Sequence, residues 1–271
     1  MKMSVSFDRV SDIYDATRGL PASISEQVTD TILNLTSATP DTKFFETGIG
    51  TGRIALPIVQ RGYSYTGVDI SKKMLAELHR KLEGISHRLT TVKADATSLP
   101  FADNSFDVAL TIHVFHLISN WQQALAEICR VLKSGGIYLY SHFNMDINNV
   151  DQDINQDKFD FEQKLQAIMA DYGYSLPCYG ATEQEVLDIL HEQGATLETV
   201  VAARWQFELT VGKLLEHHQN KVYRHTWHLR DDIFARVIQD LRSWSLQRYG
   251  SLDYDLSGER KFKIVVVRNW A

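Results

Sequence analysis

The residues best placed for chemistry are three glycines at alternate positions, Gly48, Gly50 and Gly52, and the acid Asp69 that follows them. Glycine tolerates positive φ angles and lets a ligand approach the backbone closely. Nucleotide-like cofactors sit at the first turn between a strand and a helix of an open parallel sheet. An acid about 20 residues after such a turn can accept hydrogen bonds from both ribose hydroxyls. These residues predict a site for a cofactor that carries a ribose.

A strand, a loop and a helix must hold these residues in place. Phe44 and Phe45 lead into the glycines as an apolar strand, and residues 54–60 after the loop indicate a helix. Residues 63–69, which end in the acid, indicate a second strand, and residues 106–112 form a nearly continuous apolar run. Such a run is typical of a buried central strand of a parallel sheet. The pattern predicts an α/β fold with its site at the carboxyl ends of the strands.

Local signals mark the ends of several other elements. Ser71 is expected to cap a helix over residues 72–83, and Thr182 with Glu185 forms a capping-box pattern before another helix. An amphipathic helix is expected over residues 121–132, with the glycines of residues 133–136 ending it before the fifth strand. These signals extend the alternation of strands and helices along the chain.

The composition limits the classes of protein that fit. The 271 residues, 44% of them hydrophobic, are enough to bury a core. With 28 basic and 34 acidic residues the net charge is −6, so a nucleic-acid partner is not expected. The two cysteines, Cys129 and Cys178, imply no disulfide framework. Because neither a signal-peptide core nor an apolar run of about 20 residues is found, we expect a cytoplasmic protein without a membrane segment.

Three kinds of cofactor loop compete for the glycine segment. A dinucleotide fingerprint needs a third glycine where this chain has Arg53, a residue too large for close helix–strand packing. A phosphate-binding P-loop needs glycine, lysine and serine or threonine in succession, and this segment has none. The third kind, E-x-G-x-G-x-G, is matched at every defined position by Glu46, Gly48, Gly50 and Gly52. In this respect the segment resembles the first motif of class I S-adenosylmethionine-dependent methyltransferases.

A second segment resembles the same family more specifically. Residues 95–107 are similar to the family's phrase D-A-x-x-L-P-F-x-D-x-x-F-D. The resemblance implies that Asp95 receives the adenine amino group and that the backbone N–H of Ala96 meets the adenine ring. A carboxylate only accepts hydrogen bonds and the exocyclic amine donates them, so the chemistry fits. The resemblance therefore implies S-adenosyl-L-methionine as the cofactor and S-adenosyl-L-homocysteine as its product.

The resemblance also implies further contacts with the cofactor. Residues 7–18, which indicate a short amphipathic helix, are similar to the family's phrase F-D-x-x-A-x-x-Y-D-x-x-R, which folds over the cofactor. Tyr14 and Arg18 are therefore expected in the pocket, where a guanidinium can pair with the cofactor carboxylate. The alternative interpretation of this segment is a solvated helix with surface charges. Ile70 and Met74 occupy positions where the family packs apolar groups on the adenosine. Burial in the core is the alternative interpretation of these two residues.

His113 and His116 are the candidate catalytic residues. They follow the strand at residues 106–112, whose carboxyl end faces the crevice. Methyl transfer is an in-line displacement in which the protein supplies orientation, and an oxygen or nitrogen acceptor of high pKa also needs a base. Histidine titrates near neutrality and suits that role, and His113 is also a candidate cofactor contact. Simple packing beside apolar neighbours is the alternative for both.

A second histidine cluster consists of His217, His218, His225 and His228. Such spacings can place metal ligands on one helix face. Because no cysteine pair or H-E-x-x-H pattern adjoins them, no metal is expected.

The resemblance predicts one methyltransferase domain over residues 1–271. Its fold is expected to be a doubly wound, mostly parallel, Rossmann-like sheet of seven strands with an antiparallel closing strand and helical cap insertions. The two closing strands are expected at residues 196–210 and 262–270. The core is expected at about residues 22–145, 182–210 and 259–271, and the cap at about residues 146–181 and 211–258.

The chain thus resembles the small-molecule branch of the family, which includes enzymes of the ubiquinone and menaquinone biosynthesis type. It is expected to transfer a methyl group to an O, N or C atom of a small-molecule acceptor (EC 2.1.1.-). Glu46 and the glycines would hold the methionine end, and Asp69 the ribose. The alternatives are a non-catalytic S-adenosylmethionine- or nucleoside-binding protein, an enzyme that uses this cofactor for another transfer, and an NAD-dependent oxidoreductase, which Arg53 disfavours.

Overall fold

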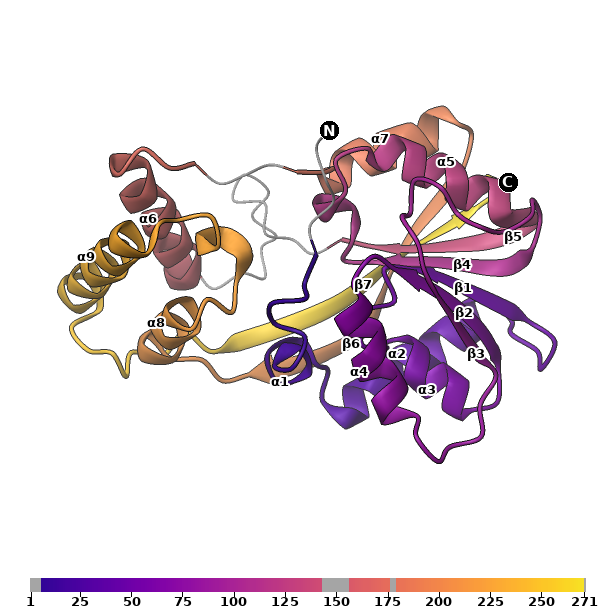
Figure 1. Cartoon of the computed structure of the whole chain (residues 1–271), viewed down its shortest axis with the longest axis horizontal. Coiled ribbons are helices and arrows are strands. Elements are labelled where there is room, and N and C mark those ends of the chain that lie inside the picture. Colours follow the sequence, from indigo (N-terminus) through magenta and orange to yellow (C-terminus); the bar gives the residue numbers. More distant parts are fainter. Residues whose placement is uncertain (1–5, 143–155, 176–178, 271) are drawn as a thin grey trace. The chain divides into compact units, whose positions relative to one another are not determined.

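A seven-stranded sheet runs through the part of the chain that the structure describes. The computed structural model describes residues 6–142, 156–175 and 179–270. The strand order is β3-β2-β1-β4-β5-β7-β6 (Figure 1). The strands are β1 (Lys43–Thr47), β2 (Ser64–Asp69), β3 (Leu89–Lys93), β4 (Phe106–Ile112), β5 (Leu132–Ser141), β6 (Thr196–Phe207) and β7 (Gly258–Arg268).

The pairing of the strands creates a crevice beside β1. Strand β1 pairs in parallel with both β2 and β4, while β2 pairs with β3 and β4 with β5 in the same sense. Strand β7 is antiparallel to β5, with Val266 opposite Leu139. Because the strand order reverses between β1 and β4, the carboxyl ends of these two strands form the switch point where ligands bind in such sheets. The predicted fold class is confirmed, including its antiparallel closing strand.

Helices cover both faces of the sheet. Figure 1 shows α2, α3 and α4 on one side of the strands and α5 and α7 on the other. This double cover explains the nearly continuous apolar sequence of β4. The helices are α1 (Tyr14–Arg18), α2 (Ala22–Leu35), α3 (Ala55–Gln60), α4 (Lys72–Lys81), α5 (Trp121–Val131), α6 (Gln156–Asp171), α7 (Glu183–Glu192), α8 (Val211–Gln219) and α9 (Asp231–Tyr249), with 3-10 turns η1 (Phe115–Leu117) and η2 (Arg224–Thr226).

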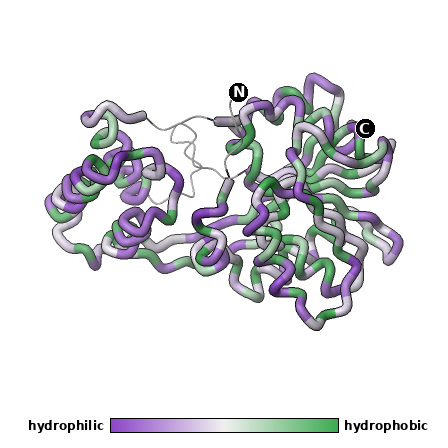
Figure 2. The backbone as a smooth tube through the Cα atoms, in the orientation of Figure 1, coloured by the Kyte–Doolittle hydropathy of each residue, from purple (hydrophilic) through white to green (hydrophobic). Residues whose placement is uncertain are grey.

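Aromatic residues fill the core beneath the crevice. The rings of Phe45 on β1 and Phe106 on β4 stack with their centroids 4.9 Å apart, and Phe101 packs edge-on against both. Figure 2 shows hydrophobic residues concentrated along the central strands. Such packing fixes β1 and β4 relative to each other.

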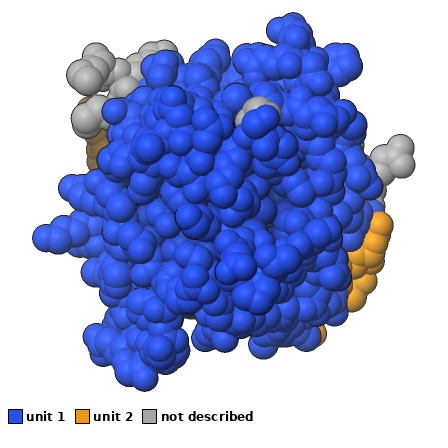
Figure 3. All heavy atoms as spheres, turned by 90° about the vertical axis from the view of Figure 1, so that its right-hand side faces the viewer, with its two compact units in different colours: residues 1–143, 179–203, 261–271 blue, residues 144–178, 204–260 orange. Residues whose placement is uncertain are grey.

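The chain divides into two compact units, coloured separately in Figure 3. The first comprises residues 1–143, 179–203 and 261–271, and the second comprises residues 144–178 and 204–260. Strands β6 and β7 therefore each contribute residues to both units. The prediction of one domain with a helical cap stays a prediction.

The second unit has its own apolar core. Helices α6, α8 and α9 pack around Leu165, Leu214 and Leu241, each of which is almost fully buried. Thr210 caps α8 by accepting a hydrogen bond from the N–H of Lys213, and the left-handed Gly250 ends α9. Among the helices that the structure describes, none combines the length and apolar character needed to cross a bilayer.

Two local predictions are wrong. Strand β5 begins at Leu132, ahead of the glycines expected to end the preceding helix. Leu132 is extended and pairs with Phe106, which lengthens the strand at the cost of a bulge before Val108. Near the N-terminus only Tyr14–Arg18 are α-helical, because residues 8–13 form turns. The predicted caps at Ser71 and Thr182 are confirmed.

Candidate active site

The glycine loop connects β1 to α3 in a left-handed backbone conformation. The φ angles are +72° at Gly48, +56° at Gly50 and +83° at Gly52. The N–H groups of Gly48 and Ile49 donate hydrogen bonds of 2.8 and 3.0 Å to the carbonyl of Val68, which ties the loop to β2. A Cβ at Gly48 would lie only 2.4 Å from the Val114 side chain. Both the φ angle and the packing therefore require glycine at position 48.

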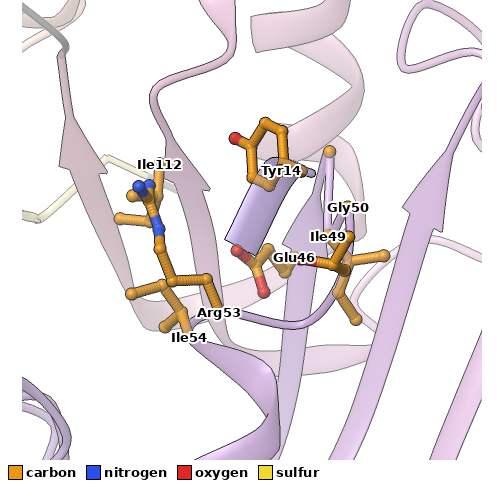
Figure 4. A pocket seen from close by; sticks show the side chains of 9 residues that line it. Tyr14, Glu46, Ile49, Gly50, Arg53, Ile54 and Ile112 are labelled. Atoms are coloured by element: carbon orange, nitrogen blue, oxygen red, sulfur yellow. The ribbon is translucent and has the colours of Figure 1, made fainter. Parts of the chain in front are cut away.

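A pocket opens at the carboxyl ends of β1 and β4 (Figure 4). The Glu46 carboxyl, the Tyr14 ring and the Arg53 side chain surround the same opening in this view. The pocket is lined by Tyr14, Glu46, Gly48, Ile49, Gly50, Thr51, Arg53, Ile54 and Ile112. The switch point of the sheet thus carries a small polar opening, of about 270 Å³ including open solvent, at the place where ligands bind in such sheets.

Glu46 is a buried carboxyl with one fixed partner. It is 2% exposed, and the Tyr65 hydroxyl donates a 2.8 Å hydrogen bond to its Oε2 atom. Burial raises the pKa of Glu46 to about 8, although the Tyr65 hydrogen bond and the Arg53 charge act in the opposite direction. A buried carboxyl of raised pKa gains most from a cationic ligand, such as the ammonium of a bound amino acid.

Asp69 is the last residue of β2, and backbone N–H groups fix the orientation of both its carboxylate oxygens. The N–H of Gly50 donates to Oδ2 at 2.9 Å, and the N–H of Ser71 donates to Oδ1 at 2.8 Å. Burial raises the pKa of Asp69, and these two backbone donors oppose that shift. Each oxygen keeps a lone pair for a further donor. The carboxylate is therefore held beside the glycine loop and can receive a diol.

Arg53 and His113 are brought together from positions 60 residues apart. Arg53 Nη2 lies 3.0 Å from His113 Nδ1. Because a guanidinium can only donate, Nδ1 accepts and the ring proton sits on Nε2. Burial, followed by the charge of Arg53, lowers the pKa of His113 well below its ordinary value. In this arrangement His113 is a neutral acceptor for Arg53, which leaves it poorly suited to act as a base.

His116 lies in η1 close to His142, which follows β5. The two imidazole rings are 5.7 Å apart, and the Tyr140 hydroxyl lies 2.8 Å from His142 Nδ1. Burial raises the pKa of Tyr140, so that its hydroxyl stays neutral. His116 and His142 thus form a pair at the ends of adjacent parallel strands.

The N-terminal helix α1 is attached directly to the glycine loop. Thr51 donates a 2.6 Å hydrogen bond to Asp15, which also pairs with Lys81 of α4. Arg53 donates to the backbone carbonyl of Arg18 at 3.1 Å. Tyr14 lines the pocket, whereas the Arg18 guanidinium lies over the Tyr14 ring at 5.3 Å and does not line it.

Asp69 and His113 are not among the residues that line this opening, and the same is true of the other predicted cofactor residues Gly52, Ile70, Met74, Asp95 and Ala96. Asp95 is exposed, and its Oδ1 accepts hydrogen bonds from the N–H and hydroxyl of Thr97 at 2.9 and 2.8 Å. Ala96 and Met74 are buried, and Ile70 is half-buried. Ile70 follows β2, Asp95 and Ala96 follow β3, Met74 lies in the first turn of α4, and Gly52 is buried within the glycine loop.

Sequence reasoning missed several residues that build this site. Thr51 and Arg53 line the pocket, while Asp15, Tyr65 and Lys81 support it. Arg53 has a visible signal, since it lies directly after the glycines, although in the sequence it serves only to disfavour a dinucleotide loop. The other contacts depend on which strand faces meet, and no local pattern reports that. Within the described residues, no group of three or more metal-ligating side chains converges.

Comparisons with known proteins agree with this geometry. A family model described as a methyltransferase domain matches residues 45–140, which run from within β1 through the glycine loop into β5. The demethylmenaquinone methyltransferase of Renibacterium salmoninarum is 29% identical over 144 residues, which are 53% of this chain and 59% of that protein. The sterol 24-C-methyltransferase ERG6B of Gibberella zeae is 30% identical over 179 residues, or 63% of this chain and 46% of that protein.

A solved structure shows the same fold. Phosphoethanolamine N-methyltransferase 2 of Haemonchus contortus, in complex with phosphomonomethylethanolamine and S-adenosylhomocysteine, aligns with a TM-score of 0.56 at 17% identity. The alignment covers 97% of this chain and 57% of that one. The chain spans about half the length of the curated relatives it matches. Residues 45–140 of the chain are thus similar to the methyltransferase domain, its relatives include a demethylmenaquinone methyltransferase, and its fold is that of this solved methyltransferase.

Proposed function

We propose that this chain transfers a methyl group from S-adenosyl-L-methionine to an O, N or C atom of a small-molecule acceptor and releases S-adenosyl-L-homocysteine. The observation that supports this most directly is the pocket that joins the buried Glu46 carboxyl to the glycine loop at the switch point of the sheet. The methyltransferase-domain match covers this region of the chain. The relatives' names support the same class of reaction.

The polar residues of the site fit the parts of this cofactor. Glu46 and the N–H groups of the glycine loop would hold its amino-acid end, because a buried carboxyl of raised pKa favours an ammonium partner. Asp69 would accept hydrogen bonds from the two ribose hydroxyls. Asp95 and the N–H of Ala96 would receive the adenine edge. The bound cofactor supplies the methyl group in an already activated form, so the protein has only to position it and exclude water.

Apolar and N-terminal residues would complete the enclosure. Ile70 and Met74 would pack beside the adenosine, and Tyr14 would cover the pocket with its ring. Arg18 would reach the carboxylate of the amino-acid end only by leaving its stacking contact with Tyr14. The Asp15 contacts with the loop would hold this helix closed.

Proton transfer from the acceptor would fall to His116 or His142 rather than to His113. The Nδ1 atom of His113 already accepts from Arg53, so its role would be to position that arginine. His116 and His142 follow β4 and β5 in the chain, and the proposal places the acceptor beside them, in line with the methyl group. The low cysteine count further favours a cytoplasmic location.

The first test is calorimetric titration of the full chain with S-adenosyl-L-methionine, S-adenosyl-L-homocysteine and NAD. Both adenosyl-sulfur ligands should bind and NAD should not. In a parallel unfolding measurement, ligand at 100 times its dissociation constant should raise the free energy of unfolding by about 2.7 kcal/mol. Absence of binding by either sulfur ligand would overturn the proposal. Tight binding without turnover of any acceptor would favour the non-catalytic alternative.

Substitutions sharpen this test. Asp69→Ala should weaken binding of both ligands by about 10-fold or more, because a buried acceptor of two hydroxyl donors is lost. The exposed Asp41 gives a matched control with the same change of charge. Unchanged affinity in Asp69→Ala would contradict the ribose assignment while leaving the reaction class intact.

A further inference from the structure

Arg53 lines the pocket with a positive charge that its own hydrogen bonds do not balance. Its Nη1 atom donates a 3.1 Å bond to the backbone carbonyl of Arg18, and its Nη2 atom donates a 3.0 Å bond to Nδ1 of His113. A backbone carbonyl carries no charge, and burial lowers the pKa of His113 so that its ring is neutral. Among the residues that the structure describes, no carboxylate forms an ion pair with Arg53. A guanidinium has five N–H donors, so further donors remain for an oxygen ligand.

His113 contacts Arg53 from an uncommon backbone conformation. Its φ angle is +58°, and such angles in residues other than glycine are concentrated at functional sites. The N–H of His113 donates a 2.8 Å hydrogen bond to the carbonyl of Ser141, and its ring lies 5.8 Å from the ring of Phe262. These contacts from β5 and β7 fix the imidazole, which in turn orients the guanidinium.

Glu46 lies beside the same opening and offers the complementary chemistry. Figure 4 shows the Glu46 carboxyl and the Arg53 side chain at the pocket that both residues line. Because burial raises the pKa of Glu46 to about 8, its carboxyl is protonated at neutral pH and does not neutralise Arg53. An α-amino acid carries a carboxylate and an ammonium on one carbon. A ligand of this kind can give its carboxylate to Arg53 and its ammonium to Glu46.

We propose that Arg53, oriented by His113 and by the Arg18 carbonyl, binds the carboxylate of the amino-acid end of S-adenosyl-L-methionine. This inference rests on the proposed function and gives the carboxylate to a residue other than Arg18. The Arg18 guanidinium lies over the rings of Tyr14 and Phe7 at 5.3 and 5.5 Å, outside the pocket lining. A guanidinium fork matches the two oxygens of a carboxylate. The pocket therefore selects the carboxylated cofactor over its decarboxylated form.

The test compares the binding of S-adenosyl-L-methionine with that of decarboxylated S-adenosylmethionine, which lacks only the carboxylate. Calorimetric titration of the full chain should show that the unaltered protein binds the carboxylated form more tightly by about 10-fold or more. In Arg53→Gln this preference should fall to about twofold or less, because affinity for the carboxylated form is lost. Methylthioadenosine, which lacks the whole amino-acid group, should bind both proteins alike and shows that the variant keeps an intact pocket.

His113→Gly and His113→Asn test whether His113 positions Arg53. Glycine keeps the positive φ angle and removes the acceptor, whereas asparagine tolerates this φ and supplies an amide oxygen in place of Nδ1. The preference for the carboxylated cofactor should fall by about threefold or more in His113→Gly and should be largely restored in His113→Asn. A purely structural role of His113 would instead change the affinity for both forms by the same factor.

Arg88→Gln removes an exposed arginine of the same unit and is the matched control, which should keep the full preference. The inference is wrong if the unaltered chain binds both forms equally, or if Arg53→Gln weakens both by the same factor. It is also wrong if Arg18→Gln loses the preference while Arg53→Gln keeps it, since the carboxylate then belongs to Arg18. These results leave the proposed function standing, whereas failure of the unaltered chain to bind S-adenosyl-L-methionine at all overturns both.

Discussion

The Tyr65 hydroxyl donates a 2.8 Å hydrogen bond to the buried carboxyl of Glu46, and the two side chains come from neighbouring parallel strands. This bond gives a neutral hydrogen-bond donor to a carboxyl whose negative charge is made unfavourable by burial. Because burial raises the pKa of Glu46 to about 8, the carboxyl is protonated at neutral pH until a cation binds. Binding of a cationic ligand would therefore favour loss of the Glu46 proton and give the carboxyl a negative charge.

Glu46→Gln should stabilise the ligand-free protein at high pH. Between the unfolded pKa near 4.5 and the folded pKa near 8, the native carboxyl holds a proton that the unfolded one releases, so stability falls as pH rises. Glutamine has no charge to bury, so this loss of stability with rising pH disappears. Its amide oxygen can still accept the hydrogen bond from the Tyr65 hydroxyl. At pH 8.5 the free energy of unfolding of Glu46→Gln should exceed that of the wild type by a few kcal/mol. The difference should vanish near pH 4, and urea unfolding at each pH measures it.

The exposed Glu83 offers the matched control, since Glu83→Gln makes the same chemical change outside the pocket. A pH-independent difference between wild type and Glu46→Gln would contradict the raised pKa. The same variant should bind S-adenosyl-L-methionine more weakly, because it cannot acquire a negative charge.

Asp15→Asn should loosen the N-terminal helix over the glycine loop. The change removes the charge that pairs with Lys81 and weakens the hydrogen bond from Thr51. A partly exposed pair of this kind contributes about 0.5–1 kcal/mol, so amide exchange of residues 14–18 should accelerate about two- to fivefold. Mass-spectrometric hydrogen exchange measures this directly.

The control for this change is Asp12→Asn, one turn earlier in the same segment, where the acid is exposed. Its exchange rates should match those of the unaltered chain. Equal rates in both variants would show that the contacts of Asp15 do not hold the helix.

His113 should not titrate between pH 5.5 and 8. Its Nδ1 atom accepts from Arg53, and burial lowers its pKa well below the ordinary value, so it stays neutral across this range. Nitrogen chemical shifts of the imidazole rings report this, with exposed histidines of the same chain as the internal reference. A His113 signal that moves with the exposed ones would contradict the assignment.

His113→Asn gives an independent check. The residue has a φ of +58°, a conformation that asparagine tolerates, and the amide oxygen can replace Nδ1 as an acceptor. Once an acceptor is found, the rate should fall less than about 10-fold, whereas loss of a general base costs about 10²- to 10⁴-fold. His116→Asn and His142→Asn are the comparison variants, and the larger loss identifies the base.

Glu162→Gln should destabilise the second unit. Burial acts to raise the pKa of Glu162, but the charges of His218 and His225 outweigh burial and lower this pKa to about 2. The resulting stability is present above the unfolded pKa near 4.5 and is lost as pH falls toward 2. At pH 6 the free energy of unfolding of Glu162→Gln should be about 2–3 kcal/mol below that of the wild type. Urea unfolding should show this difference shrinking toward pH 3.

Asp253→Asn removes an exposed acid from the same unit and serves as its control. A constant difference from pH 6 to pH 3 would show that packing, not charge, explains the effect of Glu162. His218 is fully buried, so its contact with Glu162 is the natural centre of this dependence.

Much of the first unit could be predicted from short stretches of sequence. Strand β4 occupies the expected residues 106–112, because a central strand covered on both faces must be apolar throughout. The cap at Ser71 and the capping box of Thr182 with Glu185 are set by bonds between residues three apart. The place of Asp69 at the end of β2 follows from the same alternation of strand and loop.

The tertiary structure alone decided which of these residues meet. The contacts of Glu46 with Tyr65 and of Arg53 with His113 depend on strand order and register, which no short window encodes. The start of β5 at Leu132 was decided by pairing with β4, which overrode the glycine signal. The sequence by itself determined the glycine loop and the fold class, since residue types set the local backbone requirements. Long-range pairing determined the protonation state of the site, since burial and neighbouring charges come from segments far apart in the chain.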